Sequence, residues 1–356
     1  MESRQTGNRP EAVRSLPFDA WPNADKAAWT DACRKPIRLQ KGGPAAHLRP
    51  ITREDLARRY GYLLDFVSRT EGLDVKAPAA FYVTPERIER FLSELQHRVG
   101  SVTVYGTIYK VRRMAQLLAP TLRFDWLIEI EKDLDLLKRP QSKMDRFVYS
   151  HELVQAGLAL MCEAESVSLK SRLGRARQYR NGLMVALLGF HPIRLKNFTA
   201  LELQRSLKPL GSSSWIILSA SETKEKRADE REIVALLLPW LQNYLDIYRP
   251  ILAKGRVSQA LWLSSNDGSP MTYSGVESAI YEATLQTIGK KISPHLFRTA
   301  GASTAAVYAG HQPRLATALL HHTSPEVAGE HYNRATSLSA AQSYAALVRA
   351  YAGTRA

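Results

Sequence analysis

Hydrophobic positions recur at helical spacing through most of the first 140 residues. Residues 1–50 are the exception: they mix Pro, Gly and charge with scattered aromatics, which predicts a loosely ordered N-terminal extension with at most one helix. Beyond them, hydrophobic residues three and four positions apart predict four helices, which begin near residue 52 and cover residues 87–99, 101–118 and 125–137. Because the connections are mostly short, the four helices predict a helical domain over residues 51–139.

The second half of the chain has a mixed pattern. After a basic linker over residues 140–149, helical spacing covers residues 150–166 and 172–188, and Gly189 is expected to end the second helix. Two short β-rich runs follow, and the charged residues between them predict a hairpin with a long charged tip. These runs are Trp215–Leu218 and Glu232–Leu237, with 221–231 as the tip. Helical spacing returns from residue 238, so this half is predicted to be mostly helical with a small antiparallel β-sheet.

Charge indicates the kind of partner. The 356 residues carry a formal net charge of +15, with +7 in residues 1–150 and +8 in residues 151–356. A composition of 45% hydrophobic and 23% charged residues is that of a globular protein, which excludes a disordered basic tail protein. Both halves are therefore expected to face a polyanion such as nucleic acid.

Cysteine usage and hydropathy indicate the compartment. Cys33 and Cys162 are too few and too far apart for a disulfide framework or a zinc module, and they fit a reducing cytoplasm. The sequence shows neither a signal peptide nor an apolar run long enough to span a membrane. We therefore expect a cytoplasmic protein without a membrane partner.

The stretch with the strongest chemical signal covers residues 283–325. It contains no Asp or Glu but four Lys or Arg and four His residues, a composition suited to phosphate binding. Ser293 and Pro294 are expected to start a helix, which puts His295 and Arg298 on one face near a helix N-terminus, where both would point at one anion.

Further basic and hydroxyl side chains complete an ordered set along the second half. The set is Arg194, Lys224, His295, Arg298, His322 and Tyr332. With this set, residues 150–340 resemble the catalytic domain of the tyrosine recombinase (phage integrase) family, and the preceding helices resemble its core-binding domain. The resemblance implies a mainly α fold with a small antiparallel sheet, in which the two domains form a clamp around duplex DNA.

Attack on a phosphodiester adds negative charge to the two nonbridging oxygens, which cations and hydrogen-bond donors must meet. Arg194 and Arg298 suit this task because guanidinium groups bind phosphate oxygens bidentately and stay charged. The resemblance implies that both clamp the scissile phosphate and that His322 donates a hydrogen bond to it.

The resemblance also implies roles for the groups that move protons. Tyr332 would be the nucleophile that forms a 3′-phosphotyrosyl bond; because an unperturbed phenol has a pKa of about 10, cations and a base must help, and His295 is the expected helper. Lys224 would protonate the departing 5′ oxygen. Neither ATP, a metal ion nor another cofactor is expected.

Other interpretations stay open at several positions. Lys226 and Arg227 compete with Lys224 in the same charged tip. Three histidines, His321, His322 and His331, are a poor match to zinc-ligand sets, because no Cys is near. Three further tyrosines, Tyr308, Tyr344 and Tyr351, are better interpreted as packing residues.

Two positions depart from the family pattern. His321 stands where the family usually has Gly, and Asn197 stands where Glu or Asp is common. Neither replaces a catalytic side chain, but loss of turnover at these positions would leave a noncatalytic DNA-binding relative. A topoisomerase or resolvase activity using the same residues is the other alternative to a site-specific recombinase.

A basic and aromatic cluster lies on the helix predicted over residues 101–118. Tyrosines can pack against sugars and cations can neutralise phosphates, so this cluster and the linker are expected to contact DNA, with a solvated helix face as the alternative. The residues are Tyr105, Tyr109, Lys110, Arg112, Arg113 and Lys143.

The remaining expectations concern assembly. The resemblance implies double-stranded DNA as partner, a homotetramer in the synaptic complex, accessory directionality proteins, and origin in a mobile genetic element. An amphipathic helix over residues 336–356 is expected to dock on a neighbouring protomer. DNA binding would make the cytoplasmic protein nucleoid-associated.

Overall fold

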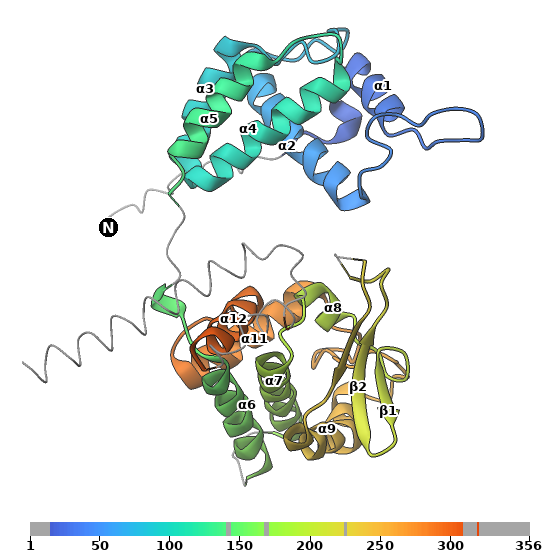
Figure 1. The fold of residues 1–356 in the computed structure, drawn as a ribbon, viewed down its shortest axis with the longest axis vertical. Coiled ribbons are helices and arrows are strands. Elements are labelled where there is room, and N and C mark those ends of the chain that lie inside the picture. Colours follow the sequence, from blue (N-terminus) through green and yellow to red (C-terminus); the bar gives the residue numbers. More distant parts are fainter. Residues whose placement is uncertain (1–14, 140–143, 167–170, 224–225, 309–318, 320–356) are drawn as a thin grey trace, which may run out of the picture. The chain divides into compact units, whose positions relative to one another are not determined.

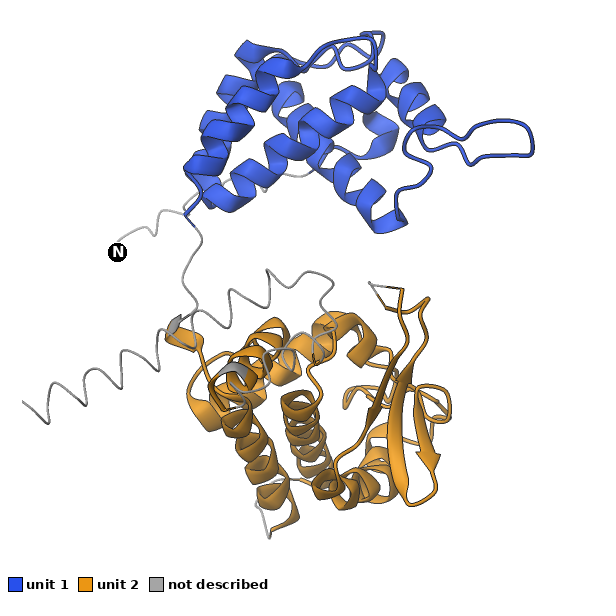
Figure 2. Cartoon of the chain, in the orientation of Figure 1, with its two compact units in different colours: residues 1–142 blue, residues 143–356 orange. Residues whose placement is uncertain are grey.

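The computed structural model describes residues 15–139, 144–166, 171–223 and 226–308, together with Leu319. The chain divides into two units, Met1–Ser142 and Lys143–Ala356 (Figure 2). Each unit has its own large hydrophobic core. None of the helices in the described ranges is long and apolar enough to span a membrane.

Unit 1 is helical (Figure 1). Its elements are η1 (Phe18–Ala20), α1 (Asn23–Ala32), α2 (Pro50–Thr70), α3 (Pro85–Arg98), α4 (Ser101–Leu118) and α5 (Asp125–Leu136). The four helices predicted from the hydrophobic spacing correspond to α2–α5. Thr84 caps α3 as its side chain accepts a hydrogen bond from the Arg87 amide. Helix α4 packs against α1, α2, α3 and α5, which explains why its hydrophobic side is fully buried.

The predicted separate extension over residues 1–50 is corrected for residues 15–49, which pack into unit 1. Trp21 is 1% exposed, and its ring lies 5.1 Å from that of Tyr60 on α2. Asp25 is fully buried and accepts hydrogen bonds from the Tyr60 hydroxyl (2.8 Å) and the Ala80 amide (2.7 Å). Scattered aromatics show no helical period, so their burial depends on tertiary contacts that the local pattern does not reveal.

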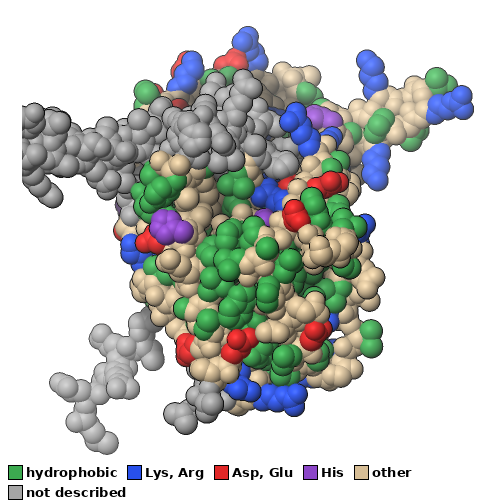
Figure 3. Space-filling model, turned by 60° about the horizontal axis from the view of Figure 1, so that its bottom comes forward, with side chains coloured by type: hydrophobic (Ala, Val, Ile, Leu, Met, Phe, Trp, Pro, Cys, Tyr) green, Lys and Arg blue, Asp and Glu red, His purple; other side chains and the backbone are tan. Residues whose placement is uncertain are grey.

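Unit 2 is built around one buried helix. Its helices are η2 (Met144–Arg146), α6 (Ser150–Glu165), α7 (Arg172–Phe190), α8 (Leu195–Thr199), η3 (Ala235–Leu237), α9 (Leu238–Asn243), η4 (Tyr244–Tyr248), α10 (Arg249–Ala253), α11 (Tyr273–Ile288) and α12 (Pro294–Tyr308). Helix α7 is buried on all sides from residue 178 to residue 189 and packs against α6, α10, α11 and α12. Hydrophobic side chains gather on one face of this unit, with charged side chains around them (Figure 3).

A three-stranded antiparallel sheet completes unit 2, with the order β1 (Leu207–Leu210), β2 (Ser213–Leu218), β3 (Asp229–Glu232). Trp215 pairs with Glu232 and Leu218 pairs with Asp229. The prediction of a mainly α fold with a small antiparallel sheet is confirmed. The predicted second strand is corrected, because β3 begins at Asp229 inside the expected tip and residues 235–237 form the short helix η3. Strand β1 was not predicted.

Three glycines allow α6 and α7 to lie unusually close. Gly189 does not end α7, which continues to Phe190, so that prediction is wrong; a Cβ at Gly189 would lie 2.8 Å from a methyl group of Val154. A Cβ at Gly157 would lie 2.6 Å from the carbonyl oxygen of Gly182, and one at Gly182 would lie 2.7 Å from that of Gly157. Since these neighbours are backbone atoms, a side chain at either position would push the helices apart.

We predict that Gly157→Ala lowers the free energy of unfolding by about 1–3 kcal/mol, the usual cost of overpacking a core. The matched control is Gly106→Ala on α4, where a Cβ would have no neighbour within 4 Å. This control is expected to stabilise its helix by up to about 1 kcal/mol, because alanine has the higher helix propensity. Urea unfolding of both variants measures the difference, and equal effects of the two substitutions would contradict the close approach.

Candidate active site

The turn over residues 191–194 joins α7 to α8 and carries the first predicted arginine. The His191 amide donates to the Leu187 carbonyl (2.8 Å), and the Ile193 amide donates to the His191 carbonyl (2.7 Å). Arg194 is the N-cap of α8, and its carbonyl accepts hydrogen bonds from the amides of Asn197 and Phe198, both at 2.9 Å. The backbone of Arg194 is therefore held at the start of a helix, and its side chain is partly exposed.

Arg298 on α12 reaches the same turn. Its side chain is 7% exposed, and Nη1 donates a hydrogen bond of 2.7 Å to the Pro192 carbonyl, 106 positions away in the sequence. Pro192 also lies against Gly301, where a Cβ would be 3.1 Å from the proline ring. The structure thus brings the start of α12 to the turn that carries Arg194.

His295 lies in the first turn of α12, as predicted from Ser293 and Pro294. Its side chain is exposed whereas that of Arg298, one turn later, is buried. This difference is consistent with a buried guanidinium that is fixed in place and an imidazole that can be reached from outside.

The hairpin tip is described on both sides of Lys224. Thr223 is 8% exposed; its hydroxyl accepts a hydrogen bond from the Arg227 amide (3.1 Å) and donates one to the Arg227 carbonyl (2.7 Å). This double contact closes the base of the tip. Lys226, the competing lysine, adopts a left-handed backbone conformation with φ of 55°.

Several predicted residues lie outside the described ranges, so the expectations for them stay predictions. They are Lys143, Lys224, His321, His322, His331, Tyr332, Tyr344, Tyr351 and the helix over residues 336–356.

Sequence reasoning missed a buried ion pair on β3. Arg231 donates through Nε to Asp229 Oδ1 (2.7 Å) and through Nη2 to Asp229 Oδ2 (3.0 Å), and their side chains are 9% and 10% exposed. The signal was available, because residues two apart on a strand lie on the same face. It was hidden by the interpretation of residues 221–231 as a solvated tip.

His191 lies close enough to this pair to respond to it. Burial, with a smaller contribution from the positive charge of Arg231, lowers the pKa of His191 to about 4. Its side chain is 7% exposed, and Nε2 is buried without a hydrogen-bond partner in the described part of the chain. His191 is therefore neutral at pH 7.

The basic and aromatic cluster of unit 1 is present as a cluster on α4. The rings of Tyr105 and Tyr109 stack with centroids 6.3 Å apart, and the Arg113 guanidinium donates to the Tyr109 hydroxyl (3.1 Å). Two of the predicted cations are already neutralised, since Lys110 pairs with Asp55 and Arg112 forms a bidentate pair with Glu131. We call Tyr105, Tyr109, Lys110, Arg112 and Arg113 the α4 surface.

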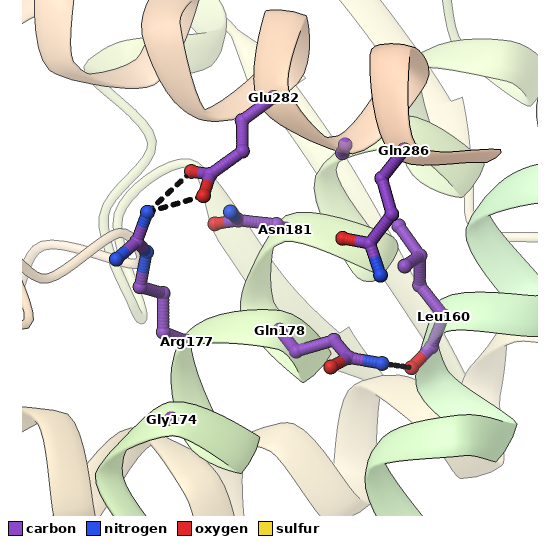
Figure 4. Close-up of a pocket in the computed structure, with 8 residues that line it drawn as sticks. Leu160, Gly174, Arg177, Gln178, Asn181, Glu282 and Gln286 are labelled. Atoms are coloured by element: carbon purple, nitrogen blue, oxygen red, sulfur yellow. Dashed lines mark hydrogen bonds and ion pairs between the residues drawn. The ribbon is translucent and has the colours of Figure 1, made fainter. Parts of the chain in front are cut away.

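A separate polar pocket of about 220 Å³ lies between α6, α7 and α11 (Figure 4). Arg177 and Glu282 form an ion pair across it, and the Gln178 side chain donates to the Leu160 carbonyl (3.1 Å). Of the predicted catalytic residues that the structure describes, Arg194, His295 and Arg298, none lines this pocket. Within the ranges that the structure describes, no group of three or more His, Cys, Asp and Glu side chains is placed to hold a metal ion.

The chain is similar in structure to solved recombinases. The XerH site-specific recombinase bound to difH substrate in a pre-cleavage complex matches with a TM-score of 0.52 and 14% identity, over 80% of this chain and 76% of that one. XerH bound to palindromic difH in a post-cleavage complex gives 0.47 and 12%, over 90% and 94%, and XerA recombinase gives 0.40 and 20%, over 84% and 94%. No family model and no curated protein matches the sequence. The likeness to the pre-cleavage XerH complex confirms the fold that the sequence resemblance predicts.

We predict that His191 makes the stability of unit 2 depend on pH. Because its pKa in the folded protein is about 4, below the unfolded value of 6.5, the unfolded chain binds the proton more readily. Stability is complete above pH 6.5 and falls as the pH drops towards 4, by about 2 kcal/mol at pH 5.

The measurement is urea unfolding at pH 7 and pH 5 for the wild type and for His191→Gln, which should lose less stability on acidification. His97→Gln, at an exposed position on α3, is the control and should behave as the wild type. The same acid sensitivity in His191→Gln would show that the burial of His191 has no such effect.

Proposed function

We propose that the chain is a site-specific DNA recombinase of the tyrosine type, which cleaves and rejoins DNA strands through a 3′-phosphotyrosyl intermediate. The observation that carries the proposal is the hydrogen bond from Arg298 to the Pro192 carbonyl, because it brings one predicted arginine to the turn that carries the other, Arg194. The order of the six motif residues and the fold shared with the XerH recombinase support the same proposal.

In this proposal, Arg194 and Arg298 hold the scissile phosphate. The charge that develops on the nonbridging oxygens is met by two guanidinium groups, which keep their proton at any working pH. Arg298 is held by its bond to Pro192 in the absence of DNA, which supports a guanidinium group that is already in place when DNA binds. Donors that need no rearrangement during the reaction are the ones that lower its barrier most.

The Tyr332 oxygen forms a bond to phosphorus while its proton passes to His295, and the bond between phosphorus and the 5′ oxygen breaks as that oxygen takes a proton from Lys224. His322 donates a hydrogen bond to the phosphate. Attack by the 5′ hydroxyl of another strand reverses the step and releases Tyr332, and since one phosphodiester bond is exchanged for another, the rejoining requires no ATP.

The proposal extends to the partners. Unit 1 would grip duplex DNA through the α4 surface, and Lys143 would add a phosphate contact in the linker. Four copies would assemble on DNA, with residues 336–356 docked on a neighbouring protomer and accessory proteins setting the direction of the reaction. Such a protein would be associated with the nucleoid in the cytoplasm and would be encoded by a mobile genetic element.

We predict a covalent adduct on DNA that depends on Tyr332. The protein is incubated with a library of nicked duplexes of randomised sequence, in which loss of a short 5′ fragment traps the intermediate, and the products are separated on a denaturing gel. The wild type should form the adduct, whereas Tyr332→Phe should bind DNA equally well and form none.

Tyr308→Phe is the matched control, because Tyr308 ends α12 with an exposed side chain and should not be needed for the adduct. An adduct retained by Tyr332→Phe would refute Tyr332 as nucleophile. DNA binding by the wild type without any adduct would support the noncatalytic alternative, and relaxation of supercoiled DNA without strand exchange would support the topoisomerase alternative.

We also predict that Arg113→Ala weakens DNA binding uniformly across sequences. The plot of log affinity against log salt has a negative slope, and its magnitude should decrease by about 1, the value for one lost phosphate contact. Filter binding at several salt concentrations measures this slope. Arg34→Ala removes a cation that follows the end of α1 and pairs with Asp31, and it should leave the slope unchanged. Equal slopes for the wild type and Arg113→Ala would remove Arg113 from the DNA interface.

A further inference from the structure

The ion pair of Asp229 and Arg231 makes a third contact outside the sheet. Arg231 Nη2 donates a hydrogen bond of 2.8 Å to the carbonyl oxygen of Leu319, 88 positions away in the sequence. One guanidinium group therefore binds a carboxylate on its own strand and a backbone carbonyl of a distant segment.

Leu319 is held from a second side. Its side chain packs with Ala302 and Ala305 of α12, and a Cβ at Gly301 would lie 3.3 Å from one of its methyl groups. The backbone of Leu319 is thus bound to β3 and its side chain is bound to α12, the helix that carries His295 and Arg298. Two independent contacts fix this one residue between the hairpin and α12.

Leu319 lies close in the sequence to two of the predicted catalytic residues. Leu319 precedes His322 by three residues and lies in the segment that leads to Tyr332. On its other side, Arg231 lies near His191, at the start of the turn that carries Arg194. Arg231 belongs to the strand that leads out of the Lys224 tip. Arg231 therefore binds Leu319, which packs on α12, and lies near the turn that carries Arg194.

Stability alone does not account for such a pair. Removing two charges from water costs about as much as their attraction returns, so a hydrophobic pair at these positions would be equally stable or more so. What a hydrophobic pair lacks is a donor for the Leu319 carbonyl. The planar guanidinium can bind a carboxylate with one edge and a carbonyl with its remaining N–H groups, which lysine cannot do.

We propose that Asp229 and Arg231 are positioning residues for strand cleavage: Asp229 orients Arg231, and Arg231 anchors the Leu319 carbonyl so that the following His322 and Tyr332 reach the phosphate held by Arg194 and Arg298. This inference rests on the proposed recombinase function. It assigns a role to two residues outside the six motif positions.

The test is the rate of adduct formation at saturating DNA, measured with the nicked duplex library for the wild type, Arg231→Lys and Asp229→Asn. Arg231→Lys keeps the charge and the ion pair but loses the second edge, and we expect the rate to fall by about 10²-fold, as for a misplacement of about 1 Å. Asp229→Asn keeps the contact of Arg231 with the Leu319 carbonyl but weakens the bidentate pair with residue 229, so its adduct rate should lie between those of the wild type and Arg231→Lys. DNA affinity should not change in either variant.

Arg177→Lys is the matched control, because it alters an ion pair of the same unit that bridges α7 and α11, and its adduct rate should equal that of the wild type. Urea unfolding gives the folded fraction of each variant. A merely structural role would lower that fraction while the folded molecules reacted at the wild-type rate.

The outcomes separate the two proposals. If the wild type forms the adduct and folded Arg231→Lys forms it equally fast, the positioning role is wrong and the recombinase function stands. If the wild type forms no adduct, the recombinase function fails and the positioning role fails with it. A slow Arg231→Lys with normal DNA affinity supports both.

Discussion

The hydrogen bond between the buried Arg298 guanidinium and the Pro192 carbonyl is the contact on which the arrangement of the site depends. Among the residues of unit 2 that the structure describes, it is one of three cases in which a largely buried arginine binds the carbonyl of a distant segment. The other two are Arg180 to Leu263 (2.6 Å) and Arg231 to Leu319 (2.8 Å). A buried charge is costly unless its donors are used, so each arginine strongly favours the one geometry in which its carbonyl is in reach. Burial lowers the pKa of Arg180 to about 10, and even this group remains charged at pH 7.

These contacts require the close packing of α6 and α7. Gly157 and Gly182 let the two helices approach until backbone atoms meet, and Gly189 continues this contact to the last turn of α7. The turn that carries Arg194 directly follows α7, so the packing of α6 against α7 determines where this turn lies. The predicted site residues Arg194 and Arg298 thus depend on a scaffold in which neither the turn nor the buried arginines can move without opening the core.

Much of this could be predicted from the sequence, and the exceptions have a common cause. Helices α2–α5 and the start of α12 follow from hydrophobic spacing and from Thr84, Ser293 and Pro294, which are local signals. The burial of Trp21, the role of Gly189 inside α7 and the start of β3 at Asp229 depend on residues far away in the sequence. The same holds for Arg231. Its charge predicted an exposed side chain, whereas it is largely buried and binds the carbonyl of Leu319, a residue far away in the sequence. The motif order predicts Arg194, His295 and Arg298 as a set, but only the fold shows that Arg298 reaches the turn that carries Arg194.

The central claim is that the protein joins itself to DNA through the oxygen of Tyr332. Its most direct test is tryptic digestion of the covalent adduct, followed by mass spectrometry of the peptide that carries the nucleotide. Cleavage after Arg314 and Arg334 yields residues 315–334, in which Tyr332 is the single tyrosine, whereas Tyr308 lies in the peptide 299–314. The account predicts a 3′-linked nucleotide on residues 315–334. A nucleotide on another peptide, or one linked through its 5′ end, would contradict it.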